Sequence, residues 1–571
     1  MQFIRRYSNI SFILCVLIVV FVRLNYHQNN HKNGYNATTW DALGYYIYLP
    51  STFIYNDVSE LNWFAELDEK YDLSSGDFYQ ANKISEERHV FKYLGGVAIL
   101  QSPFFMVAHV YAKLSDYPAD GFSAPYQYAI IWGAIIWFLF GLWVLKVCLR
   151  KFFNERVTAI VILLLLGASN LIQYVSLDGA MSHAFIFPLY SFLLWLTIKW
   201  HEHFKLKYIF LIGIVIGIAT ISRPTELIMI FIPLLWGCQS FGDFKNKITF
   251  IFKEYQQFLL LFFGGILGVL PQIIYWKIAS GDWIYNVGSK WYFFNPWWRV
   301  LFGFEKGWFI YTPIAFFMII GLLFIKGRVF QKSVTVFILL NIWIIISWSD
   351  WRYGASYSTR ALTHSYPVFV FALAGLVNYI WKSKLKWVFG FIGVYLIATN
   401  LFQVWQYNAG IIHYNDMNRK YYAAVYWKSN PSPLDYSLLD TDFRLSSEQL
   451  EGLNISKEIY FDSSNIVLPP FKDLILAHFT INTENILKNK IKINAQKGYN
   501  KGVINISSYK GDSTIQAENF RLSLPFYKNK SSNVYENNFL IKPEVDSVIV
   551  CLKPFGKMNL KNISCKSAIG S

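Results

Sequence analysis

An acidic residue surrounded by aromatic residues follows the first apolar segment of the chain. Asp41 lies near Trp40, Tyr45, Tyr46 and Tyr48. Desolvation by such neighbours raises the pKa of a carboxyl group, which can then take a proton from a bound hydroxyl group. The alternative is an aromatic belt at the membrane–water boundary that happens to include an Asp. Asp41 is therefore a candidate general base.

Basic residues form a second group, at or near the outer ends of expected spans. Charges at membrane depth are costly and usually have a partner or a task, and a shared explanation here is an anionic ligand such as a lipid-linked phosphate. Arg suits phosphate because its planar fork donates two parallel hydrogen bonds. For any single residue, snorkelling to head-group phosphates is the alternative. The group comprises Arg223, Lys290, Arg299, Lys306, Arg352 and Arg360.

A tight turn predicted on the same side carries two more candidates. The stretch 176–183 contains Asp178 and His183. Asp178 is a second candidate catalytic carboxylate. His183 is a proton carrier, a ligand of the acceptor or a residue that only ends a helix, and these three roles remain open. Glu226 is an expected ion-pair partner of Arg223.

The composition is that of a polytopic membrane protein. Of the 571 residues, 54% are hydrophobic and 15% are charged, against about 25% charged in soluble domains. Apolar runs recur over the first 410 residues, near the length that crosses a bilayer. The net charge of +16 does not indicate nucleic-acid binding, because most Lys and Arg residues lie in short loops between spans as topology signals.

The distribution of these basic loops predicts the topology. The first span, near 11–22, is expected to stay uncleaved with its N-terminus in the cytoplasm. Residues 25–92 are expected to form a polar outer loop, and 93–112, with Pro103, a helix in the outer interface. About eleven crossings follow from the charge pattern. The remaining spans are expected near 126–147, 157–175, 180–199, 206–222, 225–240, 256–279, 308–325, 333–348, 362–381 and 386–407.

The composition changes near residue 431, which predicts a membrane domain over 1–430 and an extracytoplasmic domain over 431–571. Alternating runs such as 521–526 and 548–550 favour a small β-rich binding or shielding module. Cys551 and Cys565 can form a disulfide if this domain is extracytoplasmic, and the sequence leaves that open. No Cys/His spacing indicates a metal site, and no cofactor is expected, although a divalent cation remains possible.

Five short elements of residues 1–410 resemble GT-C-type membrane glycosyltransferases, such as protein mannosyltransferases and lipid A aminoarabinose transferases. The resemblance implies a GT-C-like fold in the cytoplasmic (inner) membrane, about eleven helices plus a juxtamembrane helix. It departs in the first loop, where Ala42 follows Asp41 although many relatives have two adjacent acids. The five elements are Asp41 with Tyr45-Tyr46, the stretch 93–105, Ser222-Arg223-Pro224-Thr225, the stretch 301–313, and 351–360, which ends in Arg360.

The resemblance also implies a reaction. A sugar passes from a polyprenyl-phosphate donor to a hydroxyl group of a glycan, lipid or protein acceptor, with inversion at the anomeric carbon. Asp41 acts as base, with Asp178 and His183 as further catalytic candidates. The phosphate is bound by Arg360, Arg223, Arg352 and Lys306, and the substrate contacts Trp40, Tyr45, Tyr46 and Tyr353.

Two rival functions remain. A transporter or flippase of lipid-linked glycans needs polar groups deep within spans and broken helices. A non-catalytic glycan-binding scaffold tolerates the loss of Asp41.

Overall fold

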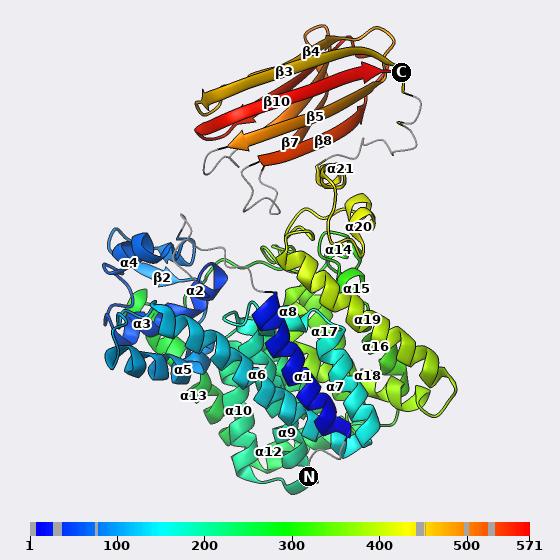
Figure 1. Ribbon diagram of the computed structural model, residues 1–571. Helices are drawn as coiled ribbons and strands as arrows, with labels where there is room; N and C mark the ends of the chain where they lie inside the picture. Colours follow the sequence, from blue (N-terminus) through cyan, green and yellow to red (C-terminus); the bar gives the residue numbers. More distant parts are fainter. Residues whose placement is uncertain are drawn as a thin grey trace. The chain divides into compact units, whose positions relative to one another are not determined.

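A computed structural model describes residues 7–26, 37–74, 78–440, 450, 453–495, 502–522 and 532–571. The chain divides into two compact units, Met1–Val404 and Trp405–Ser571. The first unit is helical and the second is built mainly from β-strands (Figure 1). This confirms a helical membrane-type region followed by a β-rich region. The predicted boundary at residue 430 stays a prediction.

The helical unit contains long apolar helices and many short ones. Its last helix, α19, continues into the second unit. The α-helices are α1 Tyr7–Asn25, α2 Asp41–Tyr46, α3 Tyr48–Phe53, α4 Phe64–Tyr71, α5 Gly96–Lys113, α6 Ala124–Phe152, α7 Glu155–Gly167, α8 Leu171–Ser176, α9 Ser182–His203, α10 Leu206–Thr220, α11 Phe231–Leu235, α12 Phe241–Lys253, α13 Tyr255–Ala279, α14 Arg299–Phe302, α15 Trp308–Tyr311, α16 Ile314–Ile320, α17 Gln331–Ile346, α18 Tyr366–Ile380 and α19 Leu385–Asn408. The 3₁₀ helices are η1 Pro224–Ile230, η2 Gly321–Phe324 and η3 Arg360–Ser365.

Five helical segments among the described residues are long and apolar enough to cross a membrane: α1, α6, α13, α19 and the continuous segment Arg360–Ile380 formed by η3 and α18. The shorter apolar helical segments are Leu206–Thr220, Pro224–Leu235, Ile314–Phe324 and Gln331–Ile346. The predicted count of about eleven crossings is therefore not confirmed.

The predicted span 157–175 is broken into α7 and α8. The Ser169 hydroxyl group accepts a hydrogen bond from the Leu171 backbone N–H at 3.3 Å, which competes with the regular helical pattern. The Asn400 amide donates to the freed carbonyl oxygens of Gly167, at 2.8 Å, and Ser169, at 2.9 Å. A side chain of α19 thus satisfies backbone groups that lipid cannot satisfy.

Other predicted spans are interrupted at proline and glycine. The span predicted at 308–325 breaks at Pro313, between α15 and α16, since proline lacks the N–H that continues a helix. At Gly321 the chain changes to a 3₁₀ helix, and a Cβ there would lie 2.2 Å from the carbonyl oxygen of Ala372. Glycine is therefore required for this close approach to α18.

Helices α10 and α13 also pack closely, through glycines spaced four residues apart. A Cβ on Gly213 would lie 2.3 Å from the Leu261 carbonyl oxygen. A Cβ on Gly268 would lie 2.8 Å from the Gly217 Cα atom. Small residues at this spacing let two membrane helices approach through their backbones.

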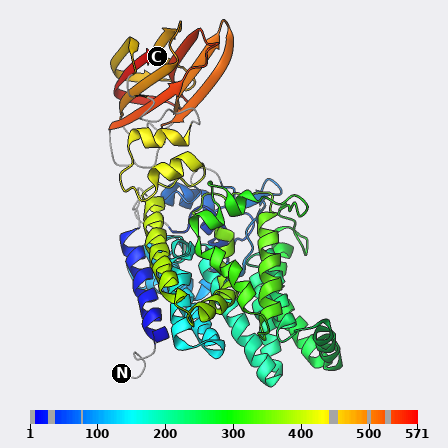
Figure 2. The same cartoon turned by 90° about the vertical axis from the view of Figure 1, so that its right-hand side faces the viewer.

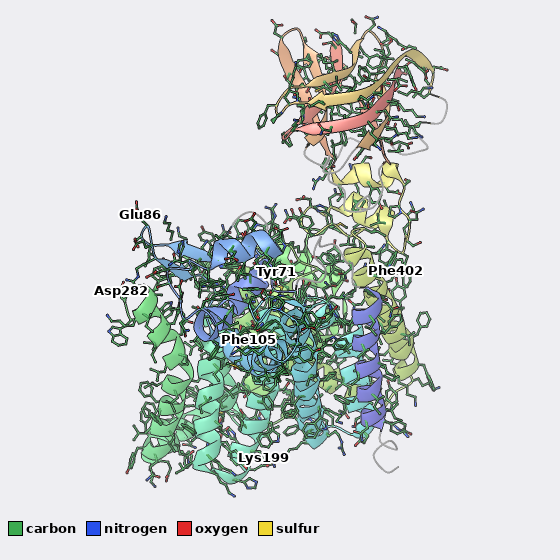
Figure 3. All side chains as sticks on the ribbon, turned by 60° about the vertical axis from the view of Figure 1, so that its left-hand side comes forward. Tyr71, Glu86, Phe105, Lys199, Asp282 and Phe402 are labelled. Carbon is green, nitrogen blue, oxygen red and sulfur yellow. The ribbon has the colours of Figure 1, made fainter. Side chains whose placement is uncertain are left out.

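Residues 25–92 were expected to form a polar loop. Their described part, within 37–92, instead contains regular secondary structure, and we call it the cap segment. It contains α2, α3, α4 and the antiparallel hairpin of β1 Ala81–Lys83 and β2 His89–Phe91. Figure 3 shows Glu86, at the hairpin turn, and Asp282 at one end of the helical unit, with Lys199 at the opposite end. α5 forms as a helix where a juxtamembrane helix was predicted, and it does not meet the criteria for a span.

The second unit is a β-sandwich (Figure 2). Its two antiparallel sheets have the strand orders β3-β10-β5-β8 and β4-β9-β6-β7. The helices before the strands are α20 Arg419–Val425, α21 Pro433–Tyr436 and the 3₁₀ helix η4 Ser437–Leu439. The strands are β3 Ile455–Leu468, β4 Leu474–Thr480, β5 Ile486–Ala495, β6 Gly502–Lys510, β7 Ser513–Arg521, β8 Ser532–Leu540, β9 Ser547–Pro554 and β10 Met558–Gly570.

The sandwich places the two C-terminal cysteines in different sheets. Cys551 lies on β9 and Cys565 on β10, and both thiols are buried and free. No disulfide joins them. The run 548–550 lies in β9, as its alternation predicted. Of the run 521–526, residues 523–526 lie outside the described part of the chain.

The predicted topology can be tested by labelling single cysteines in intact cells. The native cysteines are all buried, so they should contribute little background. Cysteines at the exposed positions Ser85 and Ser513 should react with a membrane-impermeant maleimide, because both are expected outside. A cysteine at Lys384 should react only after the membrane is permeabilised. Protection at position 513 together with reaction at position 85 would reverse the predicted side of the second unit.

Candidate active site

The carboxylate of Asp41 lies at the start of α2 and is fully hydrogen-bonded. Its Oδ1 atom accepts hydrogen bonds from the hydroxyl groups of Tyr79, at 2.9 Å, and Tyr93, at 2.6 Å. Its Oδ2 atom forms an ion pair with the Nη2 atom of Arg360. The exposed fractions of the two side chains are 20% for Asp41 and 12% for Arg360, so water screens the pair only partly.

This pairing corrects the expected pKa of Asp41. Burial by itself raises the pKa, as predicted from the aromatic neighbours. The charge of Arg360 and the hydrogen bonds from Tyr93 and Tyr79 outweigh burial, and the net result is a pKa below the ordinary value. The prediction of a raised pKa was wrong because it treated Asp41 as a lone carboxylate. In this arrangement Asp41 is a stable anion and a weak base.

The two phenol groups that contact Asp41 act as hydrogen-bond donors to its carboxylate. Burial raises the pKa of Tyr93, and the charge of Asp41 raises it further. Tyr79 is affected in the same way. Both hydroxyl groups therefore keep their protons at neutral pH. The sequence had pointed to Tyr93 only as part of the motif 93–105, and nothing had singled out Tyr79.

The guanidinium of Arg360 contacts three separate segments. Besides Asp41, its Nη1 atom lies 3.6 Å from the sulfur of Met181, in the turn before α9. Gly354 lies so close that a Cβ atom there would be 3.3 Å from Nη2. Gly354 also has a φ of +63°, in the left-handed region that favours glycine. The loop 351–359 therefore approaches Arg360 closely because it carries a glycine at this position.

Lys306 holds this loop in place. Its Nζ atom donates to the carbonyl oxygens of Arg352, at 2.9 Å, and Gly354, and to the Ser356 hydroxyl group at 3.1 Å. Burial, with a contribution from the charge of Arg360, lowers the pKa of Lys306 to about 7. Because its three protons point at the loop, the arrangement favours loop positioning over the phosphate-binding role that the sequence suggested.

The other two candidate phosphate ligands differ in their surroundings. Arg352 is 45% exposed, lies 3.6 Å from Glu305 and stacks over the Trp351 ring at 4.9 Å. Arg223 is half-buried at the start of η1. The charges of Arg223 and Arg360 both act on the phenol of Tyr353, so these two cations lie in one electrostatic environment.

The turn 177–181 brings Asp178 near Arg360. Its Oδ2 atom accepts a hydrogen bond from the Gln173 amide at 3.0 Å. Burial raises the pKa of Asp178, and the charge of Arg360 offsets this only in part. Of the two carboxylates, Asp178 is thus the one whose pKa is raised. His183 is buried and contacts His364, with 3.1 Å between their Nδ1 atoms.

The aromatic candidates divide by exposure. Trp40 is 56% exposed and is available to a ligand. Tyr45 is buried and packs edge-on against Tyr93, with ring centroids 4.8 Å apart. The hydroxyl groups of Tyr46 and Tyr353 donate to the carbonyl oxygens of Gly121 and Ile345. These last two contacts favour structural roles for Tyr46 and Tyr353.

The expected ion pair between Glu226 and Arg223 is replaced by another contact. Glu226 Oε1 lies 3.0 Å from His364 Nε2. His364 comes one turn after Arg360, and that position in the sequence was the available signal for it. Among the residues that the structure describes, no group of three or more His, Cys, Asp or Glu side chains is arranged to hold a metal ion.

Comparison with solved structures gives weak similarities. The oligosaccharyltransferase of Archaeoglobus fulgidus, in complex with zinc and sulfate, has a TM-score of 0.42 and 14% identity, covering 75% of this chain and 56% of its own. ArnT from Cupriavidus metallidurans bound to undecaprenyl phosphate has a TM-score of 0.40 and 15% identity, and the similarity covers 73% of this chain and 68% of ArnT. The arabinosyltransferase EmbB from Mycobacterium smegmatis has a TM-score of 0.31 and 9% identity, and the similarity covers 98% of this chain and 64% of EmbB. This chain thus spans little more than half the length of the archaeal protein.

A family comparison matches part of the chain. No curated protein sequence matches it. Residues 123–276 match the model of the dolichyl-phosphate-mannose-protein mannosyltransferase family. For this segment, the match confirms the resemblance to membrane glycosyltransferases that use a polyprenyl-phosphate-linked sugar. The matched segment includes Asp178, His183 and Arg223, whereas Asp41 and Arg360 lie outside it.

Proposed function

We propose that this chain is a multi-pass glycosyltransferase of the inner membrane. It transfers a sugar from a polyprenyl-phosphate donor to a hydroxyl group of a glycan, lipid or protein at the outer face. The observation that carries the proposal is the partly buried pair of Asp41 and Arg360, which sets a candidate proton acceptor beside a candidate phosphate-binding group. The match of 123–276 to a dolichyl-phosphate-mannose-dependent family supports the donor class.

Donor binding changes the state of the pair in this mechanism. Arg360 is held by a single carboxylate oxygen, and a phosphate group offers its fork two acceptors. The donor phosphate therefore draws Arg360 away from Asp41. The carboxylate stays buried but loses its nearest cation, so its pKa rises. Asp41 becomes an effective base after the donor has bound, which favours donor binding before acceptor binding.

The chemical step is a single displacement. The acceptor oxygen forms a bond to the anomeric carbon while the bond from that carbon to the phosphate oxygen breaks. The hydroxyl proton passes to Asp41, and the electron pair leaves with the lipid phosphate, so the anomeric carbon is inverted. Arg360 and Arg223 stabilise the charge that grows on the phosphate, commonly one of the larger catalytic contributions.

The surrounding residues prepare this step. Lys306 fixes the loop that carries Gly354 beside Arg360. Tyr79 and Tyr93 orient the Asp41 carboxylate while keeping their own protons. Trp40 offers an exposed ring for the acceptor or the sugar. Asp178, whose pKa is raised, is the alternative base.

Transport of lipid-linked glycans is the second candidate. The broken helices α7 and α8 and the buried Glu226–His364 contact favour it. The two functions differ in one bond, because a transferase separates sugar from phosphate and a transporter leaves the donor intact. Mass spectrometry of a polyprenyl-phosphate mannose donor after incubation with purified protein and cell-envelope acceptors separates them. Release of free polyprenyl phosphate is expected.

Asp41→Asn should lower transfer by at least about a hundredfold, because a positioned base contributes about 10²–10⁴-fold. Expression and donor binding should be retained, since the amide keeps the shape of the side chain. The measurement is the rate of polyprenyl phosphate release, with the exposed-residue variant Glu86→Gln as the matched control. Near-normal turnover by Asp41→Asn would transfer the role of base to Asp178 or indicate a scaffold.

Arg360→Lys should lower kcat/KM for the donor about ten- to hundredfold. Lysine keeps the positive charge but loses the bidentate geometry, and a charge-assisted hydrogen bond contributes about 1.5–3 kcal/mol. Arg352→Lys, at a half-exposed site, is the control and should change kcat/KM less than threefold, or about 0.6 kcal/mol. Equal effects of the two substitutions would remove Arg360 from phosphate binding.

The pKa of Asp41 should depend on Arg360. In the wild type, the Arg360 charge keeps this pKa below its ordinary value, so Asp41 gains its proton only at a correspondingly low pH. Arg360→Ala leaves burial as the dominant influence, so the pKa rises and protonation occurs at higher pH. Infrared difference spectra, with Asp41→Asn subtracted, should show the carboxylic acid band appear at higher pH in Arg360→Ala. An unchanged titration would exclude the proposed coupling.

A further inference from the structure

A buried chain of polar side chains lies next to the site and has no part in the mechanism above. Glu226 Oε1 pairs with His364 Nε2 at 3.0 Å, and His364 Nδ1 lies 3.1 Å from His183 Nδ1. The exposed fractions of the three residues are 3%, 1% and 1%. Glu226 also accepts hydrogen bonds from the hydroxyl groups of Tyr190 and Thr225. The carboxylate is thus supplied with donors on both oxygens.

The contacts assign the protons along the chain. A carboxylate can only accept, so His364 carries its proton on Nε2. When His364 is neutral, its Nδ1 atom is an acceptor, and His183 donates to it from Nδ1. The remaining nitrogen, His183 Nε2, is buried without a hydrogen-bond partner. With both imidazoles neutral, this arrangement satisfies every contact between the three residues. A protonated His364 satisfies the same contacts with the His–His hydrogen bond reversed.

The chain connects the segments that carry the candidate site. His364 lies in η3, one turn after Arg360. His183 lies two residues after Met181, whose sulfur contacts Arg360. Glu226 lies in η1, which begins directly after Arg223. Three segments distant in the sequence, each of which also carries or contacts a residue of the candidate site, thus meet in one buried cluster.

A connection of this kind supports the start of the continuous segment formed by η3 and α18, whose first residue is Arg360. η3 has six residues, and 3₁₀ helices have poorer hydrogen-bond geometry than α-helices. Tertiary contacts must therefore fix the direction of its first residue. Buried polar networks are costly to break and favour one arrangement over others. Ionisable residues buried within a unit of apolar helices also indicate a task.

We propose that Glu226, His364 and His183 are positioning residues that hold the segment carrying Arg360, so that its guanidinium lies beside Asp41 before the donor binds and reaches the donor phosphate afterwards. This inference rests on the proposed function for the identity of the phosphate. In this proposal His183 acts by positioning Arg360 and does not contact the substrate. The contact between Arg360 and Asp41 is present in the protein without donor, so the inference can also be measured without any transfer reaction.

The first test compares two substitutions at Glu226. Glu226→Leu removes both acceptors, whereas Glu226→Gln keeps the shape and one acceptor oxygen. Affinity for undecaprenyl phosphate, measured by tryptophan fluorescence in detergent, should fall about three- to thirtyfold in Glu226→Leu. Glu226→Gln should recover most of that loss. If Glu226→Leu fails to fold, Tyr190→Phe removes a single hydrogen bond to the carboxylate and should weaken binding in the same direction.

The second test asks whether the effect passes through Arg360. In an Arg360→Lys background, Glu226→Leu should weaken undecaprenyl phosphate binding less than twofold, because the geometry that the chain protects is already lost. The matched control is Ser365→Ala, which removes a buried hydrogen bond from Asn341 to the same helix η3. It should leave affinity within about twofold of the wild type. Equal losses in both backgrounds would overturn the proposal.

The third test separates this inference from the proposed function. Glu226→Leu should shift the protonation of Asp41 to higher pH in infrared spectra, in the direction of Arg360→Ala, because a displaced guanidinium stabilises the carboxylate less. If the wild type does not bind undecaprenyl phosphate, the proposed function fails while this shift still supports positioning. An unchanged Asp41 titration in a folded Glu226→Leu protein overturns the positioning role whatever the ligand is.

Discussion

The ion pair between Asp41 and Arg360 joins residues that are 319 positions apart in the sequence, and the arrangement of the site depends on it. Water screens the two side chains only partly, so each charge is costly without the other. The pair therefore fixes the cap segment over 37–92 against η3. Tyr79 and Tyr93, which follow Asp41 in the chain, donate hydrogen bonds to the other oxygen of its carboxylate.

The loop beside the pair shows how burial and charge act together. Lys306 is nearly excluded from water, and its ammonium group is satisfied by backbone carbonyls and a hydroxyl group. Those contacts set the path of the loop, and this path gives Gly354 a φ of +63°, which favours glycine. Lys306, which the sequence suggested as a phosphate ligand, thus positions the loop. Arg360 remains the cation suited to a phosphate.

The membrane part is less regular than its hydropathy suggests. Helices end within apolar segments at Ser169, Pro313 and Gly321, and each interruption leaves backbone groups that lipid cannot satisfy. At Ser169 the partner is Asn400 of a distant helix. Interrupted helices are tolerated here because the protein interior supplies the missing hydrogen bonds. Short 3₁₀ elements also adjoin the candidate site: η3 begins with Arg360, and η1 begins directly after Arg223.

The sequence by itself determined the class of the protein and the kinds of groups in its site. Hydropathy and charge are local properties, so they identified a helical membrane region, a β-rich region after it, and unusual charged residues such as Asp41 and Arg360. The contacts between distant residues were decided only by the tertiary structure. It reversed the expected pKa shift of Asp41 by adding Arg360, gave Glu226 the partner His364 in place of Arg223, and separated Cys551 from Cys565. The physical reason is that burial and pairing depend on which segments meet in space, and neither hydropathy nor residue spacing contains that information.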